Sequence, residues 1–432
     1  MLLAVTGAAL AMAAPAHANA PISAHAMVHT CCTPEAEKAR IFSEAHDLGA
    51  AYIRVDVELS GIFTAPGSEP NWDRLDQVID LSKQDHLPVL GILLGSPDWA
   101  DEEEYGRLSG LVAEHAAGVI DHWEIWNEPD GDWAFDGTAE EYARMLSAAY
   151  DRIKAKEPGA TVLLGGLARP HEPGWLQRVF DTPGADALHK FDIANVHLRG
   201  TVDAVVNRYD TFRSWLAEHG FHGPLWVTEL GYPADPAFQT DPAYKDGDAS
   251  QAAYLTQVLV GLGEVGAQEV FVTLRDNSAL EGKYVSEGLE QIDETPGGDY
   301  AVTRRASFAA VHRLIENWDQ LLAWREQQRQ YEQDQRVEQA KAAIWAGDAR
   351  TAREQFHAAR LRVHAAQDDV ARPRLPAKTA ARLSRRLDRA RALLAGRRTL
   401  LLFRSAISNW HSQRAYDNAV AAALLKQRIA GG

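Results

Sequence analysis

The fold is decided by the stretch His122-Trp123-Glu124-Ile125-Trp126-Asn127-Glu128-Pro129-Asp130. It begins as a short apolar and aromatic run that predicts a buried strand, and it stops at Pro129. Because proline has no N–H to give to a central ladder, we expect the strand to end at Asn127-Glu128. An amide and a carboxylate then stand side by side at the carboxyl end of a strand. In an α/β barrel, catalytic groups lie at this end of the strands.

A second stretch about a hundred residues later has the same design. Pro224-Leu225-Trp226-Val227-Thr228-Glu229-Leu230-Gly231-Tyr232-Pro233 is again a short apolar run that ends in a carboxylate, followed by glycine and proline. Glycoside hydrolysis requires two such carboxylates, one as proton donor and the other as nucleophile or base. The pair Glu128 and Glu229, each next to a strand-breaking proline, therefore indicates this chemistry.

Working outward, the chain alternates between strand and helix patterns. The expected strands span 23–29, 51–57, 88–95, the stretch that ends at 127, 161–166, 191–197, 225–229 and 269–276, and helical segments include 33–49, 71–85, 139–155, 250–263 and 304–316. Eight strands that alternate with helices predict an α/β fold, a (β/α)8 TIM barrel with right-handed crossovers. A doubly wound open sheet is the alternative, but no glycine-rich phosphate loop follows any of the strands.

Length and charge indicate a barrel with an appendage. The chain has 432 residues, and a barrel of this type needs about 250–300 of them. The net charge is −16, but residues 1–318 hold 22 Lys and Arg against 49 Asp and Glu, whereas residues 319–432 hold 22 against 11. This asymmetry favours two parts with different partners. The alternative is an acidic secreted enzyme whose solvated helical faces carry arginine.

Three segments follow from these patterns. Residues 1–20 form an apolar, alanine-rich run that predicts a secretory signal peptide, with cleavage expected after Ala18. Residues 21–318 form the predicted barrel domain. Residues 319–432 have amphipathic helical patterns interrupted near 347–348 and 373–376, which predict an all-α basic hairpin or bundle region. No stretch is long and apolar enough to predict a transmembrane helix.

The two cysteines, Cys31 and Cys32, are adjacent in the sequence. Neighbouring cysteines rarely form an unstrained bridge with each other, so we expect two free thiols near the rim of the site. No spaced cysteine pair predicts a zinc site.

The Trp-Asn-Glu-Pro end of the fourth strand and the Thr-Glu-Leu-Gly end of the seventh resemble the clan A glycoside hydrolases. The sequence is most similar to family 39 and to the cellulase-like family 5 enzymes, and the resemblance covers about residues 22–318. It implies a retaining mechanism in which Glu128 is the acid/base and Glu229 the nucleophile, with carboxyl groups about 5–5.5 Å apart. Glu128 is then expected to have a raised pKa, because of an apolar wall and the charge of Glu229.

The resemblance also implies roles for neighbouring residues. Asn127 would bind the sugar 2-hydroxyl, and Arg54 at the end of the second strand would orient the nucleophile. A salt bridge of Arg54 with Asp56 or Glu58 is the alternative. His197, at the end of the sixth strand, would lie beside the nucleophile or be a satisfied core histidine.

Aromatic residues after several strands are candidate sugar platforms. They are Trp99, Trp133 and Tyr232, together with Phe135. Many relatives carry an aromatic residue at the end of strand eight, where this sequence reads Leu274-Arg275-Asp276. Arg275 and Asp276 are therefore expected to form a polar floor that suits an amino, acidic or acylated sugar, or else to brace the site.

These observations predict a secreted retaining β-glycosidase that acts on an oligo- or polysaccharide. No cofactor or metal is expected, since two carboxylates suffice. The basic helices would contact an anionic polymer or the cell surface, and they would associate the enzyme with the cell envelope. Nucleic acid is not expected as a partner, because export and the acidic body oppose it. The alternatives are a catalytically silent carbohydrate-binding or cell-surface-binding barrel with a basic anchoring tail, and a scaffold protein in which the tail dominates.

Overall fold

A computed structural model describes residues 20–277, 281–294 and 300–321, with a few isolated positions between 323 and 335. The compact unit that contains the barrel extends to Trp318. The predicted signal peptide, 1–20, and the predicted helical region, 319–432, lie almost entirely outside the described residues, so both remain predictions. Among the helices that the structure describes, none combines the length and the apolar character needed to span a bilayer.

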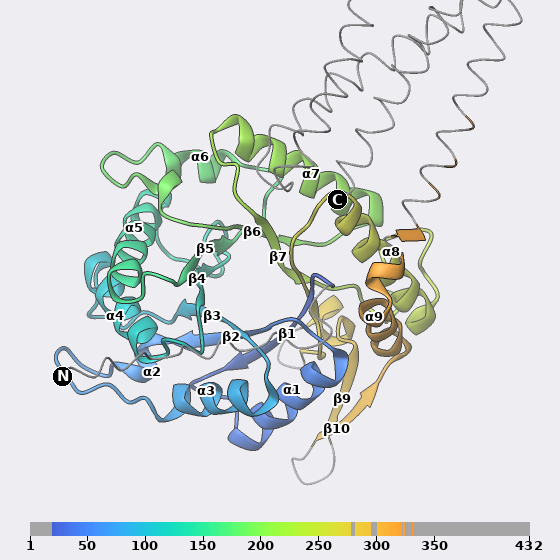
Figure 1. The fold of residues 1–432 in the computed structure, drawn as a ribbon, viewed down its shortest axis with the longest axis horizontal. Coiled ribbons are helices and arrows are strands. Elements are labelled where there is room, and N and C mark those ends of the chain that lie inside the picture. Colours follow the sequence, from blue (N-terminus) through green and yellow to red (C-terminus); the bar gives the residue numbers. More distant parts are fainter. Residues whose placement is uncertain are drawn as a thin grey trace, which may run out of the picture. The chain divides into compact units, whose positions relative to one another are not determined.

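The central element is a sheet of eight parallel strands, and it confirms the predicted barrel (Figure 1). The strands are β1 (Ile22–His29), β2 (Ile53–Glu58), β3 (Val89–Leu94), β4 (His122–Asn127), β5 (Thr161–Gly166), β6 (Ala194–Leu198), β7 (Leu225–Leu230) and β8 (Val270–Thr273). They follow the order β5-β4-β3-β2-β1-β8-β7-β6. Isolated parallel bridges from Leu163 to Ile193 and from Leu167 to Val196 close the barrel between β5 and β6.

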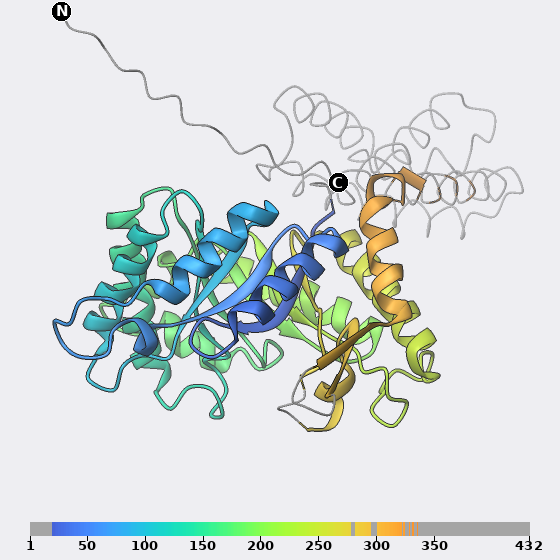
Figure 2. The ribbon, with the colours of Figure 1, turned by 90° about the horizontal axis from the view of Figure 1, so that it is seen from below.

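Helices surround the strands and cover their outer face (Figures 1 and 2). They are α1 (Glu35–Leu48), α2 (Leu59–Ile62), α3 (Asp73–Asp85), α4 (Glu102–His115), α5 (Ala139–Lys156), α6 (Gly174–Phe180), α7 (Val202–Glu218), α8 (Gly247–Glu264) and α9 (Ala306–Glu316), with 3-10 turns η1 (Ala187–His189) and η2 (Gly282–Ser286). The parallel strands and their helical crossovers form the alternating arrangement that the sequence predicts.

Side-chain caps explain where several helices begin. The Thr138 hydroxyl accepts from the backbone N–H of Glu141, and the Glu141 carboxylate accepts from the backbone N–H of Thr138, which together form a capping box. Asp101 and Thr201 cap α4 and α7 by a single hydrogen bond each, in which the side-chain oxygen accepts from a backbone N–H of the first turn. The first helix ends at Gly49, whose φ of 82° is the left-handed conformation that glycine adopts without strain.

Several elements lie outside the predicted ranges, among them the helices α2, α4, α6 and α7 and an antiparallel hairpin. Strands β9 (Glu290–Glu294) and β10 (Tyr300–Arg304) pair in this hairpin, which lies after β8. The strand β8 also ends at Thr273, three residues earlier than predicted. Arg275 instead forms an isolated bridge with Glu290, so the chain leaves the barrel wall to join the hairpin.

Apolar residues fill the lower part of the barrel. A buried cluster of inward side chains contains Leu90, Leu163, Ile193, Trp226 and Phe271. Trp123 on β4 is fully buried beside Gly91 on β3, where a Cβ would lie 2.5 Å from the indole ring. The polar groups of the next section lie above this packed layer, at the carboxyl ends of the strands.

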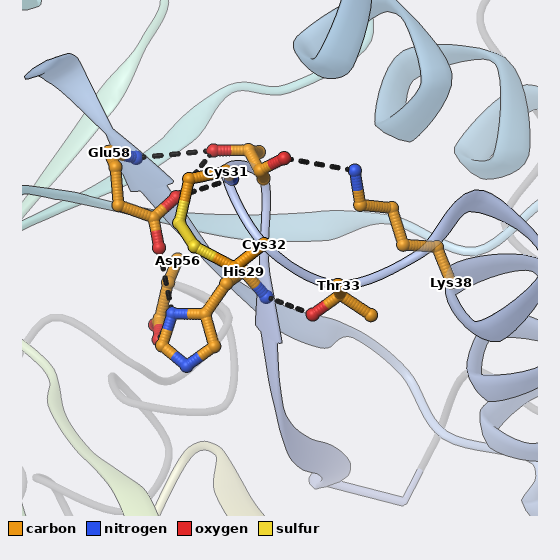
Figure 3. Close-up of a disulfide and its surroundings, with 8 residues drawn as sticks. His29, Cys31, Cys32, Thr33, Lys38, Asp56 and Glu58 are labelled. Carbon is orange, nitrogen blue, oxygen red and sulfur yellow. Dashed lines mark hydrogen bonds and ion pairs between the residues drawn. A yellow bond between two sulfur atoms is a disulfide. The ribbon is translucent and has the colours of Figure 1, made fainter. Parts of the chain in front are cut away.

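The prediction of two free thiols is wrong. Cys31 and Cys32 form a disulfide in the turn between β1 and α1 (Figure 3). Their Cα atoms are 3.8 Å apart. Sequence spacing alone disfavours such a bridge, but a tight turn can place two adjacent side chains on the same side of the backbone.

Candidate active site

Glu128 stands at a strained end of β4. The strand ends at Asn127, as Pro129 predicts, and the backbones of Trp126 and Glu128 have φ values of 69° and 46°. Such left-handed conformations are uncommon outside glycine and cost about 1–3 kcal/mol each. The neighbouring strand allows the bend, because a Cβ at Gly165 would lie 2.5 Å from the backbone oxygen of Ile125. The backbone therefore aims the Glu128 carboxylate toward the centre of the barrel mouth.

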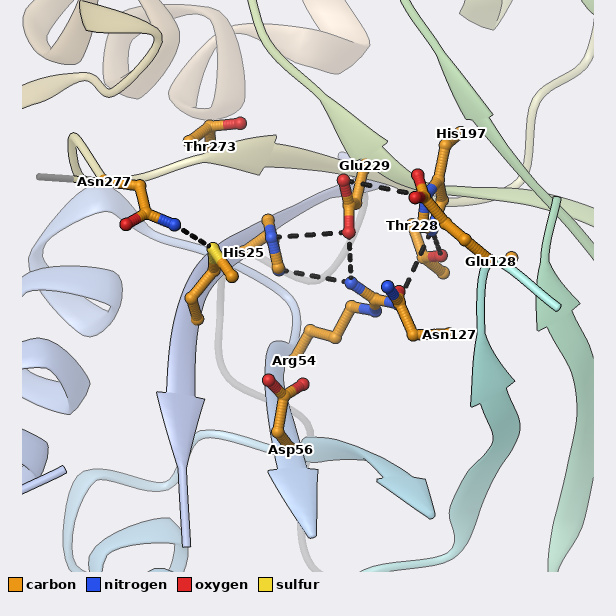
Figure 4. Close-up of polar contacts among 12 residues, drawn as sticks. His25, Arg54, Asp56, Asn127, Glu128, His197, Thr228, Glu229, Thr273 and Asn277 are labelled. Carbon is orange, nitrogen blue, oxygen red and sulfur yellow. Dashed lines mark hydrogen bonds and ion pairs between the residues drawn. The ribbon is translucent and has the colours of Figure 1, made fainter. Parts of the chain in front are cut away.

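Glu229 lies in β7, directly opposite His197 of β6. The two strands shift register between Val196 and His197, and this shift pairs His197 with Glu229. A cross-strand contact follows, with His197 Nδ1 3.6 Å from Glu229 Oε2. The same Nδ1 atom lies 2.9 Å from Glu128 Oε1. His197 thus contacts both candidate catalytic carboxylates and lies beside Glu229 (Figure 4).

Glycine makes room for this histidine. A Cβ at Gly166, the last residue of β5, would lie 2.2 Å from His197 Nε2 and 3.0 Å from Glu124 Oε1. On its other side, His197 Nε2 lies 3.2 Å from the hydroxyl of Thr228. The imidazole is therefore held between three strands, and any side chain at position 166 would displace it.

Arg54 is the hub of the site. Its Nη1 donates to Glu229 Oε1 over 2.8 Å, and its Nη2 donates to the side-chain oxygen of Asn127 over 2.7 Å. Nε and Nη2 also donate to the two oxygens of Glu124, over 3.0 and 2.9 Å. Arg54 is 1% exposed and Glu124 is fully buried. The ion pairs of Arg54 are therefore with Glu229 and Glu124, whereas Asp56 and Glu58 pair with His29. Glu124 was not among the predicted site residues.

Trp133 makes a second contact with Glu128. The indole Nε1–H donates to Glu128 Oε2 over 2.6 Å, and the residue is 61% exposed. The Arg169 guanidinium lies 4.7 Å from the indole centroid, and it pairs with Asp132. A Cβ at Gly131 would lie 2.6 Å from the ring, so the loop after β4 places this aromatic residue over the carboxylate. Trp133 therefore lies beside Glu128, and its role as a sugar platform stays a prediction.

The two candidate catalytic carboxylates are close. Donor atoms of Glu128, His197 and Glu229 all lie within 4.8 Å of one another. One oxygen of Glu128 therefore lies within 4.8 Å of one oxygen of Glu229 at the mouth of the barrel.

Cations hold Glu229 ionised. Burial raises the pKa of Glu229, but His197, Arg54 and Arg199 outweigh this effect and hold the pKa well below its usual range. His25 lies 3.6 Å from Glu229, yet burial lowers the pKa of His25 to about 3. Its imidazole is therefore neutral near physiological pH and contributes little charge.

The expectation of a raised pKa for Glu128 is wrong for the free site. Burial raises the pKa of Glu128, as does the charge of Glu229, but the hydrogen bonds from His197 and Trp133 and the charge of His197 outweigh them, so the pKa is lowered. The expected rise came from an apolar wall and a neighbouring carboxylate, whereas His197 and Trp133 each contact a different oxygen of Glu128.

A second group of residues at the site was not predicted. Arg199, just after β6, lies 3.3 Å from Glu229 Oε2 and 3.1 Å from both oxygens of Glu287. Its guanidinium also lies 5.5 Å from the ring centroid of Tyr284. A Cβ at Gly231 would lie 2.7 Å from Glu287 Oε2. The glycine of the Thr-Glu-Leu-Gly motif, Gly231, was the one sequence feature that pointed to this group, because only a residue without a side chain leaves room for Glu287.

Other predicted residues lie elsewhere. Tyr232 is 2% exposed and its ring stacks on Tyr254 at 3.7 Å, so it is a core residue and not a sugar platform. Trp99 lies half-buried in the turn after β3, and Phe135 packs against Trp126.

Arg275 and Asp276 brace the structure and do not form a floor for a sugar. The Arg275 guanidinium is directed at the carboxylates of Glu37 and Glu44 on α1, and it is 6% exposed. Asp276 accepts from Arg305 over 2.8 and 2.7 Å. The expected polar floor is therefore wrong, and of the two alternatives that the sequence left open, bracing is the one that the structure shows.

No protein-family model matches this sequence, and no curated protein does. Among solved structures, the barrel is similar to a family 39 glycoside hydrolase from the gut symbiont Bacteroides cellulosilyticus WH2, with 16% identity, a TM-score of 0.54, and coverage of 68% of this chain and 63% of that one. It is also similar to the exo-β-1,4-mannosidase Op5Man5 from Opitutaceae bacterium strain TAV5, with 17% identity, a TM-score of 0.51, and coverage of 70% and 60%. A third similar structure is a GH5_18 protein from Streptomyces cattleya in complex with Manb1-4GlcNAc, with 14% identity, a TM-score of 0.50, and coverage of 68% and 81%. These similarities confirm the predicted fold, and the chain spans less than two thirds of the first two structures.

Proposed function

We propose that this protein is a retaining β-glycoside hydrolase that cleaves O-glycosidic bonds of an oligo- or polysaccharide, with Glu229 as nucleophile and Glu128 as acid/base. The observation that carries the proposal is the proximity of the two carboxylates at the carboxyl ends of β4 and β7, where one oxygen of Glu128 lies within 4.8 Å of one oxygen of Glu229. This supports the short spacing of retaining enzymes, about 5–5.5 Å, over the spacing of about 6.5–9.5 Å in inverting enzymes. A barrel similar to family 39 and family 5 glycoside hydrolases supports it.

The first step uses the ionised Glu229. Its carboxylate attacks the anomeric carbon while Glu128 gives its proton to the leaving oxygen, so that a glycosyl ester forms and the alcohol departs. Arg54 donates hydrogen bonds to the nucleophile Glu229 and to the side-chain oxygen of Asn127. Because the Asn127 oxygen is bound in this way, its amide N–H groups are left to bind the sugar. A hydrogen bond from this amide to the 2-hydroxyl would strengthen in the transition state.

The second step reverses the proton transfer. The esterified Glu229 is neutral, and Glu128 removes a proton from water as the water oxygen attacks the anomeric carbon. The ester bond then breaks, which releases the sugar and restores the Glu229 carboxylate. Before the first step, Glu128 must hold a proton although its pKa is lowered in the free site. A sugar that displaces water and the Trp133 N–H removes one donor from Glu128, and this change raises its pKa.

The test is hydrolysis of a panel of β-aryl glycosides by the wild type, Glu128→Ala and Glu229→Ala, with Asp98→Asn as a control carboxylate at the same end of the barrel. Both glutamate variants should lose turnover, and the control should not. With azide, Glu229→Ala should give a glycosyl azide of inverted configuration and Glu128→Ala one of retained configuration. Undiminished turnover in either glutamate variant would contradict the assignment. Glycan binding without turnover by the wild type would favour the silent binding protein.

We also propose that the protein is secreted, and that the basic residues of 319–432 contact an anionic polymer at the cell surface. The excess of Lys and Arg in 319–432 supports the contact with an anionic polymer, and the apolar run at 1–20 supports secretion. A chain that ends at Trp318 should lose salt-sensitive binding to an anionic cell-wall polymer and keep its turnover of aryl glycosides. Equal polymer binding by both chains would exclude a role of the basic region.

A further inference from the structure

His29, Asp56 and Glu58 form a second polar group at the barrel mouth, where β1 and β2 end (Figure 3). His29 Nδ1 lies 2.7 Å from Glu58 Oε1 and 3.1 Å from Asp56 Oδ2. One donor atom from each residue lies within 4.8 Å of the other two. Asp56 and Glu58 are each 8% exposed, whereas the His29 side chain is 36% exposed. The glycosidase mechanism uses none of these three residues.

The group has more acceptors than donors. Two buried carboxylates share one imidazole nitrogen, and a single N–H serves one of them well. Among the residues that the structure describes, the ion pairs of Asp56 and Glu58 are both with His29. Two neighbouring cations are engaged elsewhere, since Arg54 binds Glu229 and Glu124, and Lys38 donates to the Thr30 carbonyl oxygen over 3.1 Å. Buried carboxylates in such surroundings are normally paired or bind metal.

We propose that His29 Nδ1, Asp56 Oδ2 and Glu58 Oε1 bind one divalent metal ion of the Mn²⁺ or Zn²⁺ type. Imidazole and carboxylate ligands suit these ions. With bonds of about 2.0–2.2 Å, ligand atoms lie about 3.0 Å apart around an octahedral ion and about 3.4 Å apart around a tetrahedral one. The 3.1 Å separation of His29 and Asp56 fits this range, and the 2.7 Å separation of His29 and Glu58 must open by a few tenths of an ångström.

The surroundings orient the ligands as second-layer groups do in metal sites. Glu58 Oε2 accepts from the Thr30 hydroxyl over 2.6 Å and from the backbone N–H of Cys31 over 3.0 Å. Both donors bind the oxygen that faces away from His29, so Oε1 is presented to the ion. The backbone N–H of His29 donates to the Thr33 hydroxyl over 3.0 Å, which fixes the turn that carries the histidine. Such partners typically change metal affinity by about 10–100-fold when removed.

Glu128, His197 and Glu229 have a comparable spacing, but their charges are already matched. Arg54 and Arg199 both contact Glu229, over 2.8 and 3.3 Å. No arginine or lysine ion pair reaches the His29 group within 20–277, 281–294 and 300–321, so the two clusters differ in net charge. We therefore assign the metal ion to the His29 group and not to the catalytic pair.

The experiment measures metal binding directly and does not depend on hydrolysis. Full-length protein is dialysed against a chelator and then titrated with Mn²⁺, with free ion followed by electron paramagnetic resonance and Zn²⁺ used as a competitor. The variants are His29→Ala, Asp56→Asn and Thr30→Val. Asp76→Asn is the matched control, because Asp76 lies 2.7 Å from His115 Nε2 in an exposed acid–histidine pair. Glu128→Gln reports on the catalytic pair.

We expect one Mn²⁺ site per chain that His29→Ala and Asp56→Asn abolish and that Zn²⁺ displaces. Thr30→Val should weaken it at least tenfold, and Asp76→Asn and Glu128→Gln should leave it unchanged. Circular dichroism checks that each variant folds, and Thr30→Val, which keeps all three ligands, tests the site if another variant does not. Equal Mn²⁺ binding by the wild type and Asp56→Asn would overturn the proposal. So would a wild type that binds no metal at millimolar concentration. If Asp56→Asn then weakens glycoside binding, the group binds sugar hydroxyls instead.

Discussion

Replacement of Arg54 by methionine tests the central claim about the site, namely that one buried guanidinium holds two carboxylates in place. Arg54 donates to Glu124 through two nitrogens and to Glu229 through a third. Both Arg54 and Glu124 are at most 1% exposed. Removing one partner of a buried pair costs about 3–5 kcal/mol, because the remaining charge is left uncompensated. At about 1.5 °C per kcal/mol for a domain of about 300 residues, the melting temperature should fall by about 5–8 °C.

A matched control uses the same chemistry at the surface. Arg107 binds both oxygens of Glu104 over 2.7 and 2.8 Å, but its side chain is 46% exposed. Arg107→Met should therefore cost less than about 1 kcal/mol. In a chemical denaturation series, the double variant Arg54→Met/Glu124→Gln should recover at least half of the lost stability, since no buried charge at Glu124 remains unpaired. An Arg54→Met cost no larger than that of Arg107→Met would refute the reasoning.

Three further predictions address other parts of the barrel. Burial raises the pKa of Glu269 to about 8, so the folded protein holds a proton that the unfolded chain releases above its pKa of 4.5. The contribution of Glu269 to stability should then fall as pH rises from 4.5 to 8. In urea unfolding, Glu269→Gln should raise the free energy of unfolding by at most roughly 5 kcal/mol at pH 8.5 and change it little at pH 4. An equal effect at both pH values would contradict this. The lowered pKa of Glu128 predicts an acidic pH optimum of kcat/KM. Trp133→Phe removes one hydrogen-bond donor to Glu128 and should move the basic limb of the pH profile to higher pH. An unmoved limb would show that this hydrogen bond does not lower the pKa of Glu128. Gly166→Ala should displace His197 and reduce kcat/KM at least tenfold with a normal circular dichroism spectrum, and unchanged kinetics would show that the imidazole position does not matter.

The strand ends that carry Glu128 and Glu229 were predictable because their determinants are local. Proline or a glycine-proline pair follows each carboxylate within four residues, and a buried parallel strand cannot continue through such residues. Arg54 was predictable only through the family resemblance, since its partner Glu124 is seventy positions away and nothing local connects them. Arg54 was therefore predicted as a site residue, but Glu124, the buried carboxylate that binds it, was not.

Arg275 shows where local patterns mislead. Because Arg275 follows the eighth apolar run, its side chain was predicted to lie at the barrel mouth, where a strand that continued in the same direction would place it. The strand ends at Thr273 instead, and the carboxylates of Glu37 and Glu44 on α1 draw the guanidinium out of the barrel. Those partners lie more than two hundred residues earlier in the chain. No periodicity in the sequence reports such a contact.

The disulfide between Cys31 and Cys32 stabilises the protein differently from most. A bridge normally acts by restricting the unfolded chain, and its effect grows with the number of residues that it encloses. This bridge encloses none, so the denatured ensemble loses almost no freedom when it forms. Its effect must be local, on the turn that directs the Cys31 N–H at Glu58. Oxidation of the two thiols would then set the shape of one rim of the barrel mouth and leave the global folding equilibrium nearly unchanged.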